Sequence, residues 1–369
     1  MREDSGTKIL AAVHRSVGHP ATLETVNLAK PEDNEVRVLV DACAICHSDL
    51  MFIDGGWVTE FPTVFGHEIS GRVVEAGSSV TGLTAGTPVV VSLIATCGQC
   101  RSCQQGHDVA CENPPPSNPL TDTNNRTVTK GLNTGGFAEQ VVVHHSQVVA
   151  VPPEMPATSA SLLGCGVLTG VGAARNTANI QPGETVAVVD CGGVGMGVIQ
   201  GAQLAGATVI VAIDPQADKR SLALTMGATH TADPLNQDPA EAISQATGGR
   251  LADHVLLATA APAALNSALA LLAPMGALTL VGMPADGVTL TIDPSALAGY
   301  NQRILGSKMG TARLNRDIPA LVADYFAGRL KLDQLVSSTY PLEDLEQALD
   351  EVRSGSALRT VIVFHQPEA

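Results

Sequence analysis

The stretch Thr185-Val-Ala-Val-Val-Asp190-Cys-Gly192-Gly193-Val-Gly195 runs from an apolar segment through a glycine-rich turn into an alanine-rich segment. This order predicts a strand, a tight turn and the start of a helix. A second apolar run, Val209–Ile213, ends at Asp214, 19 residues after Gly195. In such a βαβ unit the helix N-terminus receives a pyrophosphate, and the acid at the next strand end binds ribose hydroxyls. An acid there would repel a 2′-phosphate, so the stretch predicts a dinucleotide site that favours NAD over NADP.

The turn departs from the usual pattern at one position, because Asp190 occupies the place of the first glycine. Aspartate tolerates tight-turn geometry but brings a negative charge toward a doubly anionic ligand. Two interpretations stay open: Asp190 caps the turn beside a compensating cation, or it weakens or retunes cofactor binding. The cofactor contacts expected from the turn are Gly192, Gly193, Val194 and Gly195.

The rest of the chain changes character once. Its 369 residues exceed the usual size of one core, which predicts two domains. The first part, up to about Pro153, reads as short, mostly antiparallel strands; those expected are Glu35–Val40, Gly71–Glu75, Pro88–Leu93 and Phe137–Val143. From about Pro182, apolar runs alternate with helical stretches, which predicts a doubly wound parallel sheet; its expected strands are Thr185–Val189, Thr208–Ile213, Asp253–Ala258 and Ala277–Val281.

Three further segments carry structural expectations. The segment Asn113–Gly136, rich in Pro, Asn and Thr, reads as a long surface loop. Two helices are expected near the end, Arg316–Ala327 and Leu342–Val352. The methionines at 196, 226, 275 and 309 read as core residues.

Composition excludes several classes of protein. The formal net charge of −15 argues against a nucleic-acid binder, which needs a basic face. No apolar run approaches the roughly 18 residues of a membrane span, and Met1-Arg-Glu-Asp4 carries acids where a signal peptide would be basic and then apolar. We therefore expect a soluble cytoplasmic protein with no membrane partner.

Four of the eight cysteines fall within one short window, Cys97-x2-Cys100-x2-Cys103-x7-Cys111. This spacing places four thiolates within reach of one ion, which is typical of a closed, tetrahedral structural zinc site. An iron–sulfur cluster is the alternative, but the bacterial ferredoxin run has three residues before its last cysteine. A four-thiolate site has no open position, so catalysis is expected elsewhere.

A second set of groups lies in Cys46-His47-Ser48-Asp49 and in Gly66-His67-Glu68-x2-Gly71-x5-Gly77-x2-Val80. With the four-cysteine loop, Leu163-Gly-Cys165-Gly, the turn before Asp214 and Leu358-Arg359-Thr360, these motifs span nearly the whole chain. Together they resemble the zinc-containing medium-chain alcohol dehydrogenase family. The resemblance implies a catalytic zinc bound by Cys46, His67 and Cys165, with a fourth position open to water or substrate. Glu68 and Asp49 are expected as carboxylates that support these ligands.

The resemblance also implies roles around the cofactor and the substrate. The positions of His47 and Arg359 contact the cofactor pyrophosphate in the family, Met283 is expected near the nicotinamide, and Lys219 is expected among the cofactor-binding residues. The substrate pocket is expected to contain Ser48 and an apolar lining from Trp57 and Leu93. Such a pocket suits a primary aliphatic, allylic or aromatic alcohol.

The expected reaction is reversible oxidation of an alcohol to an aldehyde. The zinc-bound alcohol loses its hydroxyl proton, hydride passes to nicotinamide C4, and Ser48 takes the proton. In the family the proton route continues through the nicotinamide ribose to a histidine at the position of Met51. A thioether does not titrate near neutral pH, so this last group is missing, and the proton is expected to leave from the ribose directly or through water.

The expected architecture is α/β: a GroES-like, β-rich catalytic domain of residues 1–166 and 309–369 with two zinc sites, and a Rossmann domain of residues 167–308 that binds NAD. The alternating stretch Val288–Ile292 corresponds to a strand that pairs across a dimer in relatives, which predicts a homodimer or homotetramer. Two other functions on the same fold stay open, a thiol-adduct formaldehyde dehydrogenase and a C=C reductase. A non-catalytic NAD- or zinc-sensing protein is the alternative from a different class.

Overall fold

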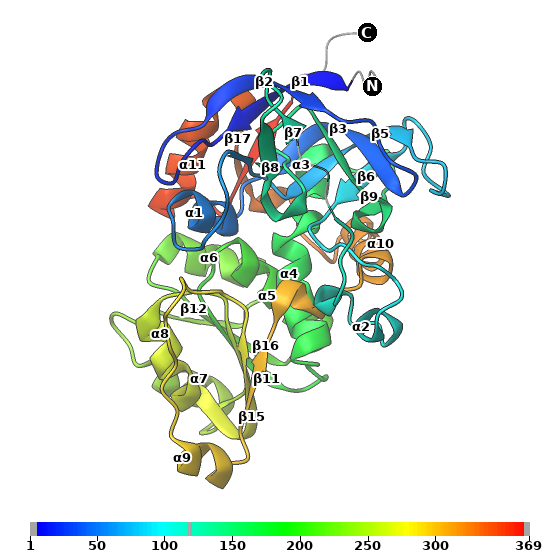
Figure 1. Ribbon diagram of the computed structural model, residues 1–369. Coiled ribbons are helices and arrows are strands. Elements are labelled where there is room, and N and C mark those ends of the chain that lie inside the picture. The colour runs from blue at the N-terminus through cyan, green and yellow to red at the C-terminus, as the bar shows by residue number, and fades with distance from the viewer. Residues whose placement is uncertain (1–5, 117, 119, 365–369) are drawn as a thin grey trace. The chain divides into compact units, whose positions relative to one another are not determined.

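The computed structural model describes residues 6–116, 118 and 120–364 (Figure 1). Residues 1–5 and 365–369, at the two ends of the predicted catalytic domain, lie outside the described residues. The chain forms two compact units, one within Met1–Cys165, Arg313–Ala323 and Leu332–Ala369, the other Gly166–Ala312 and Asp324–Lys331. Relative to the domain ranges expected from the sequence, the structure groups Gly166 and residues 309–312 and 324–331 with the second unit.

The second unit is built on a six-stranded, fully parallel sheet with the order β13-β12-β11-β14-β15-β16. Its strands are β11 Thr185–Val189, β12 Val209–Ile213, β13 His230–Ala232, β14 Ala252–Leu257, β15 Leu272–Leu280 and β16 Arg303–Gly306. The first three strands run outward from β11 on one side and the last three on the other, which is the doubly wound Rossmann order. Valine and isoleucine fill the central strands because both faces of such a sheet are covered. The predicted fold class is confirmed.

The helices of this unit are α4 Gly166–Gly172, α5 Gly193–Leu204, α6 Ala217–Thr225, α7 Pro239–Thr247, α8 Pro262–Ser267 and α9 Pro294–Gly299. Glycines let α4 and α5 pack closely. A Cβ on Gly170 would lie 2.3 Å from the Val194 carbonyl oxygen, and one on Gly197 would lie 3.2 Å from Gly170 Cα. Because α5 begins at the glycine-rich turn, this packing holds the turn in place.

The first unit contains two β-sheets, with β1 and β2 side by side in Figure 1. One sheet has the order β1-β2-β7-β8-β4, from Thr7–Val13, Thr22–Leu28, Leu120–Thr121, Thr127–Lys130 and Thr63–Val64. The other has the order β10-β6-β5-β3-β18-β17, with β9 also on β3; these strands are Val148–Ala150, Pro88–Val91, Glu68–Ala76, Glu35–Ala44, Arg359–Val363, Val336–Pro341 and Gln140–His144. Their inward residues form one core of mainly Val, Ile and Leu.

Short helices complete this unit: α1 His47–Ile53, α2 Arg101–Gln104, α3 Ala157–Ser161 and α11 Leu345–Ser354. The helix α10, Leu314–Phe326, begins in the first unit and ends in the second. The two C-terminal helices expected from the sequence are therefore present, with α11 preceded by a 3₁₀ turn at Leu342–Asp344.

Two sequence expectations are wrong. The predicted loop Asn113–Gly136 contains β7 and β8, because the alternating Thr127–Lys130 pairs in parallel with β4. Met275 is 66% exposed, whereas Met196, Met226 and Met309 are buried as expected. Val288–Ile292 pairs with no described strand of this chain, and its expected pairing across a dimer stays a prediction.

No single helix among the described residues is long and apolar enough to cross a membrane. One bent pair, Ala157–Gly164 followed by Gly166–Thr177, reaches the required length and composition only when its two parts are taken together.

The buried His14 makes stability depend on pH. Its side chain is fully buried, and neither ring nitrogen has a hydrogen-bond partner in the described part of the chain. Glu346 Oε1 lies 3.8 Å from His14 Nε2. Burial lowers the pKa of His14 from 6.5 to about 4, although Asp49 opposes the shift. The folded state therefore binds fewer protons than the unfolded state between these two pH values.

We expect stability to be fully present above about pH 6.5 and to fall by about 3 kcal/mol as the pH drops to about 4. Denaturant unfolding of the wild type and of His14→Gln at several pH values measures this. The free energy of unfolding should fall more steeply with decreasing pH in the wild type than in the variant. The difference in slope should correspond to at most about one proton bound on unfolding. Equal slopes for the two proteins would contradict the assignment to His14.

Candidate active site and metal centres

The reactive cluster is assembled by strand pairing in the first unit. The end of β3 pairs with the start of β5 in antiparallel register, which places Ala44 opposite Glu68. Cys46 follows β3 by two residues and is the N-cap of α1, while His67 immediately precedes β5. This register brings Cys46 and His67, which are 21 positions apart in the chain, into one place. Cys165, distant in sequence, lies beside them at the end of the first segment of the first unit.

The ligating atoms of Cys46, His67, Glu68 and Cys165 all lie within 4.8 Å of one another, and all four residues are buried. Asp49 orients this group. Its carboxylate accepts hydrogen bonds from the backbone N–H groups of Cys46 and Gly66, each at 3.1 Å, and from His67 Nδ1 at 3.0 Å. A proton on Nδ1 leaves Nε2 of the neutral imidazole as the free lone pair.

Two observations test whether this cluster fits a metal ion. His67 is fully buried, and its Nε2 has no hydrogen-bond partner among the residues that the structure describes. The electrostatics also favour a positive charge. Burial opposes a charged imidazole, yet Asp49 and Cys46 outweigh it and raise the pKa of His67 well above its usual value. The hydrogen bond from Cys165 lowers the pKa of Cys46 well below its usual range, against the opposing effect of burial. A soft, nitrogen-binding cation such as zinc satisfies both features.

Asp49→Asn is expected to weaken metal binding at this cluster by about 10- to 100-fold. The asparagine amide is neutral, so it attracts the His67 Nδ1–H less strongly than the Asp49 carboxylate does. Competition with a chromophoric zinc chelator measures the affinity of each ion. The four-cysteine site serves as the internal control, since Asp49 makes none of its contacts. An unchanged affinity in Asp49→Asn would show that the carboxylate does not support His67.

Glu68 and Arg359 form a buried ion pair beside the cluster, through Glu68 Oε2 and Arg359 Nη2. Burial raises the pKa of Glu68 to about 7, with the Arg359 charge acting in the opposite direction. The family resemblance placed Arg359 at the cofactor pyrophosphate. In this structure its guanidinium instead neutralises Glu68, and its pyrophosphate contact stays a prediction.

The substrate residues expected from the sequence belong to the first unit. His47 is exposed at the start of α1, and Ser48 and Met51 are half-buried on the same helix. Trp57 is half-buried, and its ring packs edge-on against Phe52 with centroids 5.1 Å apart. Leu93 is half-buried just beyond β6. Ser48 is thus fixed by the helix that also presents Cys46.

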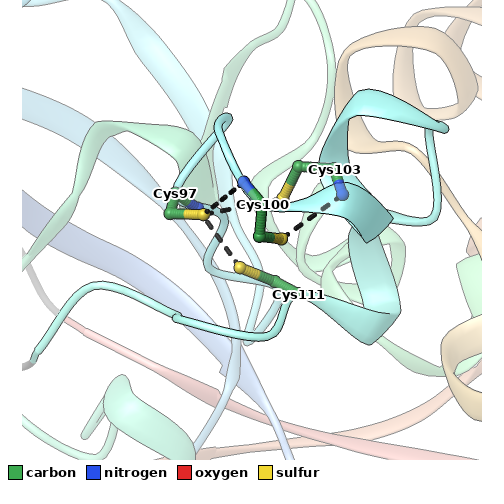
Figure 2. A group of neighbouring side chains, drawn as sticks. All are labelled: Cys97, Cys100, Cys103 and Cys111. Carbon is green, nitrogen blue, oxygen red and sulfur yellow. Dashed lines mark hydrogen bonds between the residues drawn. The ribbon is translucent and has the colours of Figure 1, made fainter.

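The four-cysteine loop forms the second candidate metal site (Figure 2). The sulfur atoms point toward one common space and lie within 4.8 Å of one another. Cys97 Sγ and Cys103 Sγ are 4.0 Å apart, close to the roughly 3.8 Å expected between thiolates in a tetrahedron with 2.3 Å zinc–sulfur bonds. The set that the structure brings together is the one predicted, namely Cys97, Cys100, Cys103 and Cys111.

Backbone donors lower the pKa of Cys97 and Cys100 in this loop and so favour their thiolate forms. The N–H groups of Glu112 and Cys103 lie 3.4 and 3.5 Å from Cys100 Sγ and lower the pKa of Cys100 to about 6. Arg313, which the sequence did not identify, anchors the loop by donating from Nε to the Gly106 carbonyl and from Nη2 to the Gln105 carbonyl. No short motif links Arg313 to the loop, because the contact spans 207 residues.

The dinucleotide turn lies in the second unit and has the predicted order of strand, turn and helix. Asp190 adopts a left-handed conformation with φ 77°, and its Oδ2 accepts the Gly192 N–H at 3.3 Å, in agreement with the capping interpretation. Gly192 caps α5, which begins at Gly193 and includes Val194. A Cβ on Gly195 would lie 1.9 Å from the Asp190 carbonyl oxygen, so the turn requires glycine there.

Asp214 is buried at the end of β12. Its Oδ2 accepts the Cys191 N–H and its Oδ1 the Gln216 N–H, both at 2.8 Å. These bonds fix the carboxylate at the place where a ribose would be recognised. Lys219 is half-buried on α6, and Met283, beyond β15, is 59% exposed. The structure brings the turn and Asp214 together through the Cys191 N–H, and the expected place of Met283 near the nicotinamide stays a prediction.

Thr134 is a second residue that the sequence did not single out. Its hydroxyl bonds the carbonyl of Gly66, next to His67. It sits in a run of Thr, Asn and Gly that indicates a surface loop, so the sequence held no signal for this contact.

These features define a metal- and dinucleotide-dependent oxidoreductase, and comparison with known proteins specifies its family. Residues 32–153 match the family described as alcohol dehydrogenase GroES-like domain, and residues 193–326 match zinc-binding dehydrogenase. The chain therefore belongs to the zinc-containing medium-chain alcohol dehydrogenase family and is an oxidoreductase. Membership of this family implies that the protein uses zinc and a nicotinamide cofactor.

Relatives match along nearly the full chain. The NDMA-dependent alcohol dehydrogenase of Amycolatopsis methanolica is 32% identical over 367 residues, covering 96% of this chain and 99% of that protein. The geraniol dehydrogenase of Castellaniella defragrans is 33% identical over 366 residues, covering 96% and 97%. The crystal structure of benzyl alcohol dehydrogenase from Acinetobacter calcoaceticus matches with a TM-score of 0.90 at 30% identity, covering 97% of this chain and 100% of that one.

Proposed function

We propose that this protein is a zinc- and NAD-dependent dehydrogenase that oxidises primary allylic, aromatic or aliphatic alcohols to aldehydes. The observation that carries the proposal is the buried cluster of Cys46, His67 and Cys165, whose ligating atoms lie within 4.8 Å of one another while His67 Nε2 has no hydrogen-bond partner among the described residues. Two thiolates and a neutral imidazole balance the charge of Zn2+ and leave one position open. When bound, the zinc supplies a Lewis acid that polarises the alcohol oxygen.

The chain's own residues perform the remaining tasks. Asp49 holds His67 in the tautomer that exposes Nε2. Ser48, two residues after Cys46, receives the hydroxyl proton of the substrate. Met51 offers no titrating group further along α1, so the proton taken by Ser48 would reach solvent without a side-chain acceptor at that position. The four-cysteine site holds a second, structural zinc and takes no part in the chemistry.

The choice of substrate rests on the apolar residues that the family resemblance assigns to the substrate pocket and on the relatives. Trp57 and Leu93, both half-buried, would provide this apolar lining. Two relatives carry the names of an allylic and an aromatic alcohol, geraniol and benzyl alcohol. NAD is favoured over NADP because the buried Asp214 carboxylate would repel a 2′-phosphate.

An NAD-linked assay over a panel of alcohols and aldehydes tests the proposal, using protein of measured zinc and bound-cofactor content. Allylic and aromatic primary alcohols should give the highest kcat/KM with NAD. Activity confined to a formaldehyde–thiol adduct, or to an activated C=C bond, would instead support one of the two alternative enzymes. The non-catalytic alternative is dropped, because the family comparison gives an oxidoreductase.

We also propose that the chain forms a homodimer or homotetramer through the second unit. Large apolar side chains are exposed there, including Met275 and Tyr300, whose backbones are hydrogen-bonded to each other. Val288 and Ile292 add to this exposed set. Ile292→Asp should lower the molar mass measured by light scattering to that of one chain. A wild type that is already monomeric at micromolar concentration would contradict the proposal.

A further inference from the structure

Gly66, the residue before His67, is held through both of its backbone polar groups. Its N–H donates to Asp49 Oδ1 at 3.1 Å. Its carbonyl, Gly66 O, accepts the Gly136 N–H at 2.7 Å and the Thr134 hydroxyl at 2.9 Å. Because this carbonyl belongs to the peptide that leads into His67, these donors set the direction in which the His67 side chain leaves the backbone.

Gly66 is closely packed, so its backbone cannot shift to compensate for a movement of its neighbours. Its φ is +91°, and a Cβ would lie 2.7 Å from Phe137 N and 3.0 Å from Cys43 Sγ. Phe137 N in turn donates to the Phe65 carbonyl at 2.9 Å. The chain before His67 is thus packed directly against residues 134–137.

The loop that supplies these donors is itself strained. Leu132 and Asn133 adopt left-handed conformations, with φ of 51° and 58°, which are unfavourable for residues other than glycine. Thr134 follows them and is fully buried. Its single hydroxyl hydrogen is shared between Gly66 O and Gly131 O, each 2.9 Å away. The Thr134 hydroxyl therefore closes the strained turn and joins it to Gly66 in one contact.

We infer that Thr134 is a positioning residue for His67: its hydroxyl fixes the Gly66–His67 peptide and so aims His67 Nε2 at the Cys46 and Cys165 thiols. Thr134 touches neither metal nor substrate and acts through Gly66. The inference rests on the proposed function, because it assigns His67 to a bound zinc.

The test compares Thr134→Val, which keeps the shape and removes the hydroxyl, with Thr134→Ser, which keeps the hydroxyl. Thr229→Val is the matched control. The Thr229 hydroxyl also bridges backbone groups, donating to Ile210 O and accepting from Ile210 N, but it lies in the second unit. Loss of the Thr229 hydroxyl should lower the stability of the protein without changing the position of His67.

The first measurement is hydrogen–deuterium exchange of a peptide spanning residues 64–68, on metal-free protein. Exchange of the Gly66 amide should be about tenfold faster in Thr134→Val than in the wild type, since about one buried hydrogen bond is lost locally. Thr134→Ser and Thr229→Val should stay within about twofold. If the Gly66 amide exchanged at the same rate in Thr134→Val as in the wild type, the inference would be overturned whether or not zinc binds.

The second measurement is zinc affinity by chelator competition. Thr134→Val should bind one of its two zinc ions about 10-fold or more weakly, while the four-cysteine ion is unchanged and Thr134→Ser matches the wild type. Equal affinity in Thr134→Val and Thr134→Ser would overturn the inference. A wild type that binds only the four-cysteine ion would instead overturn the proposed function, and the exchange experiment would still decide the role of Thr134 in fixing Gly66.

Discussion

Replacing Cys46 with serine is expected to remove one of two zinc ions and to lower kcat/KM by at least about four orders of magnitude, or roughly 5.5 kcal/mol. Cys46 supplies the lowered-pKa thiolate of the buried cluster, and a serine hydroxyl is a far poorer ligand for zinc. Without the ion, the substrate oxygen has no polarising cation, and Ser48 alone cannot replace it. Metal analysis by mass spectrometry together with the NAD-linked assay measures both effects.

Cys43→Ser is the matched control for this experiment. Cys43 is also buried in β3, three residues away, but it is not part of the cluster. It should keep both zinc ions and activity within about tenfold of the wild type, because its thiol contributes packing only. If Cys46→Ser retained two ions and near-normal activity, the assignment of Cys46 as a ligand would be wrong.

The second large effect is expected for Ser48→Ala, which should slow the oxidation step by about 10²- to 10⁴-fold while both zinc ions remain bound. The variant loses the hydroxyl that accepts the substrate proton, and Met51, three residues further along α1, is a thioether that cannot take its place. Single-turnover formation of NADH, with protiated and deuterated alcohol, isolates this step from cofactor release.

Ser48→Thr keeps the hydroxyl and should stay within about tenfold of the wild type. It distinguishes loss of the proton acceptor from a change in the shape of α1. A single-turnover rate in Ser48→Ala within about threefold of the wild type would mean that the proton leaves by another route.

The parts of this molecule that could be predicted are those whose residues are close in sequence. The glycine-rich turn, its strand and Asp214 lie within one βαβ unit, and the structure has β11 at the predicted residues. The four-cysteine spacing likewise brings its thiols together through one short loop. In both cases local geometry and residue chemistry suffice.

Contacts that depend on strand register could not be predicted from the sequence alone. Cys165 could be joined to Cys46 and His67 only through the family resemblance. The pairing of Arg359 with Glu68 follows from β18 lying beside β3, a neighbour relation that no local pattern encodes. For the same reason the run containing Thr134 was interpreted as a surface loop, although Thr134 is buried against Gly66.

The most direct test of this account is a crystal structure of the protein with anomalous diffraction measured on both sides of the zinc absorption edge. The account predicts two zinc peaks per chain, one among the four cysteines and one about 2.3 Å from the Cys46 and Cys165 sulfurs and about 2.0 Å from His67 Nε2. A single peak, confined to Cys97, Cys100, Cys103 and Cys111, would contradict the central claim that the buried cluster is the catalytic zinc site.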